Sequence, residues 1–465
     1  MKLSKLTLAC LLATSGLSAT SATQAAVTDG FEFHGYFRAG VLLSSENDFK
    51  RSNFVAQKET LGRLGLEADN DASLDFVKKW SFDDGKTIRI NVGLGDTGDE
   101  SSLSSSADAY QMGVGQTYVE FTGVTSSGKF WGGTRDYGKD NYIFMTDLFY
   151  TDMSGTGIGI EGYEVGDLLF DAAYIASDRI DDVLGRWDAN EYDKSANLNN
   201  LMHAFNLSVN FGSLELSALY KVMPDNWDEN GYQYAEVGGD LTAIYNLSSF
   251  FFIPGNGFSK IIAQAGVGLG SGNLLGGTIT SYNAYHPGSQ FQGEHNDWAA
   301  WHPSAGDAQR LLTYVDEKDT SARLLLWGGY FLENGISFFP SIQGQYNDHD
   351  ADGQWTYDTT AGGLGAYDYW VSAMVRSNFP VADNFFVSSE IGTVHNNWNG
   401  ETSSQSKITV APTWIIGTGQ GPAPEIRLLA SYIDNAWGPA RDQDENGDLK
   451  YDHDIVIGMQ ADMWW

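Results

Sequence analysis

The last eleven residues of the chain, Ile455 to Trp465, alternate between strongly apolar side chains and a mixed set. Successive side chains of a β-strand point to opposite faces of the sheet. One face therefore carries Ile455, Ile457, Met459, Ala461, Met463 and Trp465, and the other carries Val456, Gly458, Gln460, Asp462 and Trp464. The apolar face requires lipid or a second sheet to cover it, and a terminal aromatic residue there is typical of the girdle of a transmembrane β-barrel. Taken alone, this strand leaves a soluble β-protein and a membrane barrel equally open.

Similar alternating segments recur along the rest of the chain, about eighteen in all, which is a strand number found in such barrels. The segments are separated in turn by brief turns and by long polar stretches. The brief turns include Asn210–Ser213, Glu333–Gly335 and Gly419–Pro424, and the long stretches lie around residues 44–60, 178–198, 271–318 and 435–451. Short turns at one end and long loops at the other are the layout of a bacterial outer-membrane barrel. We therefore predict an all-β fold, a transmembrane antiparallel β-barrel with both termini on the periplasmic side.

Charged residues occupy the second face of the predicted strands. The first strand sets Phe31, Phe33, Phe37 and Val41 against Glu32, His34, Tyr36 and Arg38. The second, predicted to start near residue 61, sets Leu64, Leu66 and Ala68 against Arg63, Glu67 and Asp69, and the third sets Ile88, Ile90, Val92 and Leu94 against Arg89 and Asn91. Such charges are unexpected in a sandwich core but expected where the inward face of a barrel meets a water-filled lumen.

The N-terminus has the features of a secretory signal peptide. Lys2 and Lys5 supply positive charge, residues 6–17 are apolar, and small residues crowd positions 22–26. We therefore predict a signal peptide over residues 1–26 and a single barrel domain over residues 27–465. The only cysteine, Cys10, lies within the signal, so we expect neither a disulfide nor a thiolate metal site in the mature chain.

The chain is strongly acidic, with 60 acidic and 27 basic residues and a net charge of −33. Nucleic acid is not expected as a partner, because phosphate contacts need a basic surface. The acidic residues concentrate between the apolar segments, where the loops are predicted.

Closure of the barrel requires the first and last strands to be neighbours. Tyr36 and Trp464 would then share one lumen wall, near Arg38 and Asp462. Aromatic faces bind the apolar faces of sugar rings, while charged groups form hydrogen bonds with the hydroxyls. These residues therefore indicate a sugar path, although the two aromatics are also compatible with a girdle at the periplasmic rim.

Several short motifs resemble the maltoporin family of trimeric outer-membrane carbohydrate channels. They are Phe33–Arg38, Gly62–Gly65, Trp131–Arg135, Asp147–Gly155, Gly159–Glu161 and the terminal Met463–Trp465. Each motif is short, but their order and spacing run from end to end of the chain. The match is strongest over residues 31–165 and at the C-terminus, and it is vague through residues 180–320.

The resemblance implies an eighteen-stranded barrel, a homotrimer, and a third long loop, here residues 135–156, that folds inward. It also implies an aromatic slide that carries the sugar beside an ionic track of polar residues. Tyr36 and Trp464 match slide positions, and Arg38 and Arg63 match the ionic track. Asp147 matches a loop acid near the constriction, Lys139 stands where the family has an arginine, and Phe149 stands where it has a tyrosine. In the fourth strand an expected arginine is absent, although Tyr118 and Glu120 point inward there.

The chain departs from the family pattern at three expected slide aromatics, which fall on Asp71, near Ile261 and on Asn378. A register slip beside Asn378 would recover Phe379 as a lumen aromatic. The family's cysteine pair in the first loop is also absent. These departures leave the channel architecture in place but open the range of oligosaccharides.

Two acidic segments resemble the beginning of a calcium-binding loop. They contain Asp348, Asp350 and Asp352, and Asp442, Asp444 and Asn446. Neither has a glutamate at the twelfth position, so acidic external loops are the simpler interpretation. Residues Gly93–Gly98 match the dinucleotide pattern G-x-G-x-x-G but lead into a stretch rich in serine and aspartate rather than a helix, so they lack the helix N-terminus that phosphate binding needs. No zinc or hydrolase motif is found, and we expect no cofactor and no enzymatic activity.

The sequence thus predicts a passive channel in the Gram-negative outer membrane, surrounded by lipid, with maltose and maltodextrins as the expected substrates. A general diffusion porin is the nearest alternative. A secreted sugar-binding sandwich and a glycoside-cleaving enzyme are more distant ones.

Overall fold

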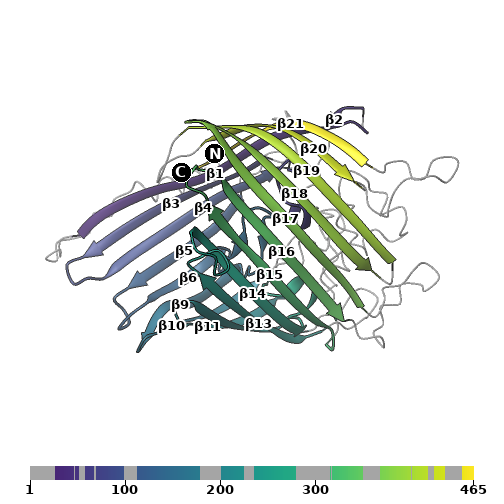
Figure 1. Cartoon of the computed structure of the whole chain (residues 1–465). Helices are drawn as coiled ribbons and strands as arrows, with labels where there is room; N and C mark the ends of the chain where they lie inside the picture. The colour runs from purple at the N-terminus through teal and green to yellow at the C-terminus, as the bar shows by residue number, and fades with distance from the viewer. Residues whose placement is uncertain are drawn as a thin grey trace, which may run out of the picture.

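The computed structural model of the chain is a closed antiparallel β-barrel (Figure 1). The structure describes residues 27–46, 48–51, 58–67, 70–98, 113–177, 201–224, 235–278, 315, 317–348, 367–398, 401–416, 424–434 and 453–465. Within these residues the main sheet has 19 strands. Strand β2 (Lys50–Arg51) has only two residues and pairs with the end of the first strand, so the other eighteen strands form the wall. The predicted fold class and strand number are confirmed.

The wall strands follow one another around the barrel in chain order. They are β1 (Val27–Ser44), β3 (Asn70–Phe82), β4 (Thr87–Gly98), β5 (Gly113–Thr122), β6 (Lys129–Arg135), β9 (Gly155–Val165), β10 (Leu168–Ser177), β11 (Met202–Asn210), β12 (Leu214–Val222), β13 (Val237–Leu247), β14 (Asn256–Gly268), β15 (Thr320–Phe331), β16 (Ser337–Asp348), β17 (Tyr367–Ala382), β18 (Phe385–Trp398), β19 (Glu401–Ile415), β20 (Glu425–Asp434) and β21 (His453–Trp464).

The barrel closes through β1, which pairs with β3 on one side and with β21 on the other. The register of the closing pair places Tyr36 opposite Trp464 and Arg38 opposite Asp462. Strands β1 and β21 accordingly lie side by side in Figure 1. The predicted neighbourhood of the first and last strands is therefore confirmed.

Most outward residues of the wall strands are apolar, whereas the inward positions carry most of the charged and polar residues together with apolar ones such as Ile262 and Leu325. On β12, Lys221 points inward and is fully buried, whereas the neighbouring Tyr220 is 51% exposed. Large outward apolar side chains remain exposed throughout, with Leu241 at 64%. An apolar outer face that is exposed to this extent requires lipid around the barrel. In the described part of the chain, no helix is both long and apolar enough to cross a membrane.

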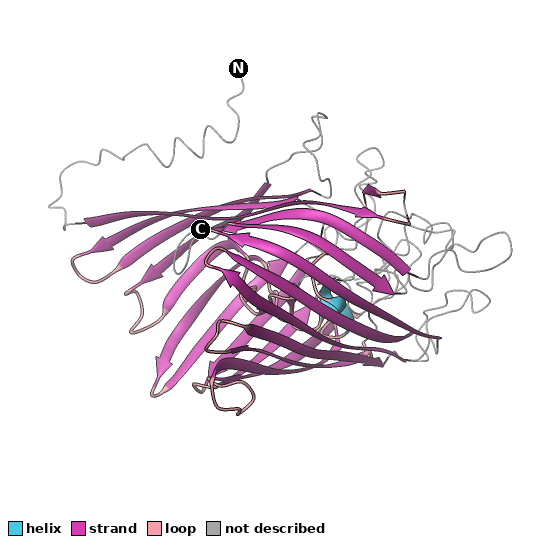
Figure 2. Cartoon of the chain, turned by 45° about the horizontal axis from the view of Figure 1, so that its top comes forward, coloured by secondary structure: helices cyan, strands magenta, loops and turns pink. Residues whose placement is uncertain are grey.

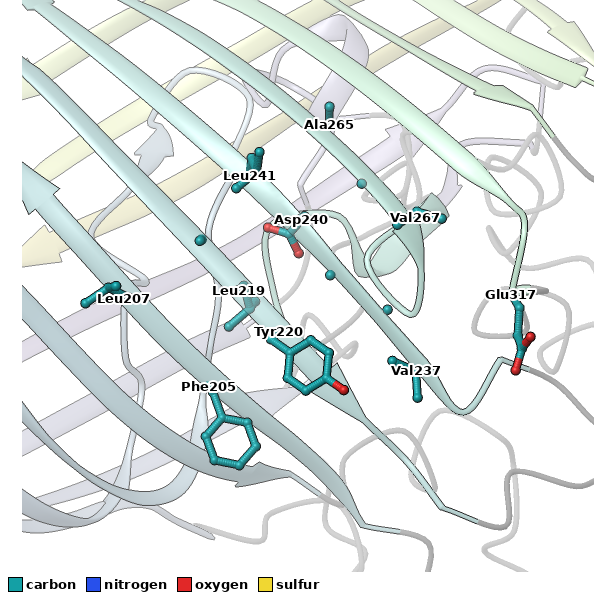
Figure 3. A pocket seen from close by; sticks show the side chains of 14 residues that line it. Phe205, Leu207, Leu219, Tyr220, Val237, Asp240, Leu241, Ala265, Val267 and Glu317 are labelled. Atoms are coloured by element: carbon teal, nitrogen blue, oxygen red, sulfur yellow. The ribbon is translucent and has the colours of Figure 1, made fainter.

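The outward face also carries a hollow of about 900 Å³ over β11 to β14 (Figure 3). Its floor is formed where the register places the small residues Ala218, Gly239 and Ala265 beside larger neighbours. Phe205 and Tyr220 stand at its edge. Because these side chains point away from the lumen, the hollow is not part of a path through the barrel.

Two of the predicted tight turns are confirmed. The turn between β11 and β12 is closed by a hydrogen bond from Phe211 N to Leu214 O at 2.7 Å. The turn between β15 and β16 uses Gly335 at φ +86°, a conformation that favours glycine. The third predicted turn, residues 419–424, lies outside the described residues except for its last member, as do most of the long polar stretches and the predicted signal peptide.

The prediction of a strand near residue 61 is wrong. The second wall strand begins at Asn70, and the preceding residues 58–67, here called the first-loop segment, start with the short helix α2 (Lys58–Leu61; cyan in Figure 2). Helix α2 contacts the inner side of β17, β18 and β19. Leu64, Leu66 and Glu67 are all buried inside the barrel, so the alternation of side chains does not mark a lipid face and a lumen face.

Two further segments lie between wall strands and carry structure of their own. Residues 136–154, here called the third-loop segment, contain the small hairpin β7 (Tyr142–Ile143) and β8 (Leu148–Phe149). Residues 269–278 contain a 3₁₀ turn (Gly272–Leu274). The two segments meet at a bridge between Asp152 and Gly277.

Candidate functional site in the barrel lumen

The wall formed by β1 and β21 carries the aromatic and charged residues predicted for a sugar path. Arg38 is only 3% exposed, and its Nη1 donates to the Tyr36 hydroxyl at 3.1 Å. Trp464 lies opposite Tyr36 in the ladder and is 46% exposed. The structure thus brings the two aromatics together on the inward register, with an arginine beside them.

The first-loop segment and the third-loop segment meet this wall through a charge cluster, here defined as Arg38, Lys58, Arg63, Glu67 and Asp147. Lys58 Nζ lies 3.0 Å from Glu67 Oε1 and 2.5 Å from Asp147 Oδ2. Arg63 Nε lies 2.9 Å from Glu67 Oε2, and Arg38 Nη1 lies 3.5 Å from Glu67 Oε1. Arg63 Nη2 also donates to the Tyr36 hydroxyl at 3.2 Å. The cluster therefore links both segments to the aromatic wall.

Electrostatic pairing keeps the cluster ionised. Burial alone would raise the pKa of Glu67, but Arg63, Lys58 and Arg38 hold it well below its usual range. Burial would also raise the pKa of Asp147, and Arg63 and Lys58 lower it below the ordinary value. For Lys58 burial would lower the pKa, and Glu67 and Asp147 raise it instead. The cluster is thus a set of fixed, mutually compensating charges at neutral pH.

The third-loop segment contacts inward side chains on distant strands. Gln264 of β14 donates from Nε2 to Tyr150 O at 2.6 Å, and Arg376 of β17 donates to Met145 O at 3.4 Å. Asp147 adopts φ +59°, which an aspartate tolerates better than most residues. The segment is therefore tied to strands far from its own ends in the sequence.

The two remaining third-loop residues predicted for the site lie close together. Lys139 Nζ sits 5.5 Å from the centroid of the Phe149 ring and 3.6 Å from Asp136 Oδ2. Phe149 stacks on Tyr142, with 5.1 Å between ring centroids. A tyrosine hydroxyl is therefore present beside Phe149, on the neighbouring strand of the small hairpin.

Tyr118 and Glu120 both point inward on β5, as predicted. Glu120 accepts from Arg89 Nη1 at 3.1 Å and lies 3.9 Å from Arg135 Nη1. Arg135 is surrounded by aromatic rings: its Cζ atom lies 4.9 Å from the centroid of the Tyr118 ring and 5.2 Å from that of the Trp131 ring. The arginine missing from the fourth strand is thus supplied by its two neighbouring strands. Alternation already placed Arg89 on the inward face, whereas the role of Arg135 was missed.

The residues at the three positions where the family pattern expects a slide aromatic are either polar or face outward in the structure. Asp71 lies 3.6 Å from Arg38, and Asn378 accepts a hydrogen bond from Ser388 at 2.6 Å. Ile261 belongs to the outward register of β14, since the adjacent Ile262 is fully buried. Phe379 alternates with the inward Asn378 and is 39% exposed. The suggested register slip at Phe379 is therefore wrong, and Phe379 faces outward.

Sequence reasoning also missed a second group of inward aromatics, here called the second aromatic cluster. It is formed by Phe144, Phe258, Trp327, Phe331 and Phe339. Phe144 packs edge-on against Phe339 at 5.1 Å, and Phe258 packs against Trp327 at 5.4 Å. Strict alternation along β14 to β16 would have placed the four strand residues inward, but no spacing links them to Phe144.

No grouping of metal-binding side chains occurs among the described residues. Of the six residues considered for calcium, only Asp348 at the end of β16 lies within them. Asp350, Asp352, Asp442, Asp444 and Asn446 lie outside the described residues, so calcium binding stays a prediction.

Comparison with known proteins places the whole barrel in one group. The LamB porin family model matches residues 31–465. The chain is 27% identical to the "Maltoporin" of Hahella chejuensis, covering 93% of this chain and 92% of that protein. It is 25% identical to the "Maltoporin" of Photobacterium profundum, covering 97% and 98% of the two chains.

Solved outer-membrane proteins are also similar to the chain. OccAB2 of Acinetobacter baumannii has a TM-score of 0.45 and 12% identity, covering 94% of this chain and 98% of that one. The trimer form of OmpT from Vibrio cholerae has a TM-score of 0.40 and 12% identity, covering 94% and 100%.

Proposed function

Because the chain belongs to the LamB porin family, and is a sugar-specific porin of the Gram-negative outer membrane, we propose that it conducts maltose and maltodextrins by passive diffusion. The sugar moves along the aromatic residues of the lumen wall, and charged groups beside them form hydrogen bonds with its hydroxyls. The channel needs no cofactor and no energy source. It works as a homotrimer, as the family resemblance implies.

The observation that carries this proposal is the pairing of Tyr36 and Trp464 across the closing strands, next to Arg38. A glucose ring presents apolar C–H faces and a rim of hydroxyls. The C–H faces stack on an aromatic side chain, and the hydroxyls form charge-assisted hydrogen bonds with a neighbouring charged group. A series of such weak contacts lets an oligosaccharide enter and leave easily, as conduction requires.

The third loop narrows the channel in this proposal. Its support is the pair of contacts from Gln264 and Arg376, on β14 and β17, to main-chain oxygens of the third-loop segment. The charge cluster then lies beside the narrowest part, where Lys58, Arg63 and Asp147 act on passing ions and on sugar hydroxyls. Tyr118, Glu120, Lys139 and Phe149 form further parts of the polar and aromatic lining.

The second aromatic cluster continues the path on the side where the expected slide aromatics are absent. Phe144, Phe258 and Phe339 are only partly buried, so part of each ring remains open for contact. They lie on β14, β16 and the third-loop segment rather than at Asn378, which is polar. A sugar would therefore follow a different wall over this part of the channel.

A general diffusion porin remains the second candidate. Asp71 and Asn378, which replace expected aromatics, favour it because they shorten the stacking surface along the expected path. The two functions differ in saturation: a specific channel binds sugar and is blocked by it, whereas a general pore is not.

Planar-bilayer conductance with a panel of added sugars separates the two. Purified protein should form ion-conducting pores whose current falls saturably with maltotriose or maltohexaose, and far less with sucrose at equal concentration. Pores that conduct ions without saturable block by any sugar would overturn the specific function in favour of the general one. Migration as a heat-dissociable trimer in gels tests the oligomeric state separately.

A further inference from the structure

A buried ion pair in the barrel wall holds the first-loop segment. Lys407 of β19 is fully buried, and its Nζ donates to Gly62 O at 2.6 Å, Leu64 O at 2.7 Å and Glu390 Oε1 at 2.6 Å. An ammonium group has three donors. All three are used, and two of them bind main-chain carbonyls of the first-loop segment.

Glu390 of β18 completes this contact from the acidic side. It is also fully buried, and its Oε1 accepts a hydrogen bond from Leu64 N at 3.0 Å. Its Oε2 accepts from Arg376 Nε at 2.6 Å, and Arg376 itself reaches Met145 O of the third-loop segment. Arg376, Glu390 and Lys407 therefore form a wall anchor that binds both inner segments.

The fit between segment and wall is close. Gly62 has φ +91°, and a Cβ atom there would clash with Glu390 Oε1. Thr409, on the same strand as Lys407, donates from its hydroxyl to Leu64 O at 3.1 Å. The wall and the segment are thus complementary over Gly62 to Leu64, and this contact fixes the height of the segment in the barrel.

The other side of the same short segment carries the charges of the channel. Arg63 lies between the two carbonyls that Lys407 binds, and its side chain reaches Glu67, Asp147 and Tyr36. Lys58 reaches the same two carboxylates. Neither cation belongs to a wall strand. Their positions depend on how the segment is held.

We propose that Lys407 and Glu390 are positioning residues for the channel: by fixing the first-loop segment against β18 and β19, they hold Lys58 and Arg63 at the constriction and so set ion and sugar selectivity. The sugar part rests on the proposed function, whereas the ion part does not. If the segment is released, Lys58 and Arg63 leave together with Glu59 and Glu67, so the segment carries away no net charge. Asp147 stays on the third-loop segment and loses Lys58 and Arg63 as ion-pair partners. A carboxylate without these partners remains at the constriction, so the pore becomes more cation-selective.

Lys407→Met tests this directly, because it removes the donors without adding bulk while Glu390 keeps its contact with Arg376. The expected result is a shift of the reversal potential toward cation selectivity and a rise of about fivefold or more in the half-blocking maltohexaose concentration, the size expected from losing positioned polar contacts. Thr409→Val removes one hydrogen bond to the same carbonyl and should shift both quantities in the same direction, by less. Thr409→Val tests the proposal if Lys407→Met does not fold.

Lys86→Met is the matched control for charge, since Lys86 lies in the turn between β3 and β4 and pairs there with Asp84. It should leave the reversal potential and the block unchanged. A folded, trimeric Lys407→Met channel with wild-type reversal potential overturns the positioning role, as does Thr409→Val without effect when Lys407→Met cannot be made. Wild-type pores with no sugar block would instead overturn the proposed function, and the reversal potentials would still test the anchor.

Discussion

Replacing Trp464 with alanine should weaken sugar binding by about tenfold. Trp464 is 46% exposed in the lumen, which is about 115 Å² if a whole tryptophan presents about 250 Å². A sugar ring covers one face of the indole, or about half of that area. At about 25 cal/mol per Å², burial of about 55 Å² is worth about 1.4 kcal/mol, which corresponds to tenfold in affinity.

Current block by maltohexaose in planar bilayers measures this change directly. The half-blocking concentration should rise about tenfold in Trp464→Ala, while the conductance in salt alone stays near that of wild type. Trp464→Phe keeps an aromatic face and should lose only about twofold to threefold, since most of the stacking area remains.

Trp414→Ala is a closely matched control. Trp414 is also 46% exposed, but it lies on the outward register of β19, where it packs on Phe385 at 5.0 Å. The same deletion at the same exposure should therefore leave the block unchanged. An unchanged half-blocking concentration in Trp464→Ala, or equal changes in both variants, would refute the reasoning.

Three further predictions concern the constriction and the wall. Asp147→Asn and Lys139→Ala should each shift the reversal potential if the third loop lies in the conduction path, and wild-type values in both would place the loop outside it. The pKa of Glu67 is lowered, so its ionised form stabilises the charge cluster above the ordinary glutamate pKa of about 4.3, and this stabilisation is lost as the pH falls below that value. The current noise of wild-type channels should therefore rise on acidification below about pH 4, and it should rise less in Glu67→Gln. Identical pH profiles of the two channels would count against the cluster. Leu241→Arg, on the lipid-facing side, should cost about 2–4 kcal/mol of folding free energy in bilayers, measured by denaturant titration, and a cost below about 0.5 kcal/mol would contradict a lipid-facing position.

The barrel itself could be predicted because its signal is local and repeated. Alternation with a period of two marks each strand, and the terminal segment 455–465 carries it almost without exception. That the first and last strands are neighbours followed from the requirement that a barrel has no free edge, whereas the register that sets Tyr36 opposite Trp464 comes from the structure.

The inner segments could not be predicted from the same signal. Residues 63–67 alternate between charged and apolar types just as a strand does, because the segment contacts charged groups on one side and the apolar inner surface on the other. Gly62 and Gly65, both at positive φ, are the local features that distinguish it from a strand. The roles of Lys407 and Glu390 were likewise hidden, since any inward charged residue of a barrel fits the alternation equally well.

Phe379 shows the limit of reasoning by resemblance. An aromatic residue adjacent to an expected aromatic position suggested a slip of one residue, but such a slip would turn every side chain of the strand to the opposite face. The ladder between β16 and β17 keeps its register through Asn378. Tertiary pairing therefore decided the face of Phe379, and local similarity did not.

The arrangement of alternate side chains toward lipid and lumen is tested most directly by spin labels placed singly along residues 455–465 in reconstituted protein. Collisions with oxygen should peak at 455, 457 and 459 and fall at 456, 458 and 460, where the side chains point inward. A water-soluble relaxation agent should reach the label at 464 but not those at 457 and 459. Accessibility to both reagents without a period of two would contradict the barrel geometry on which the proposed transport depends.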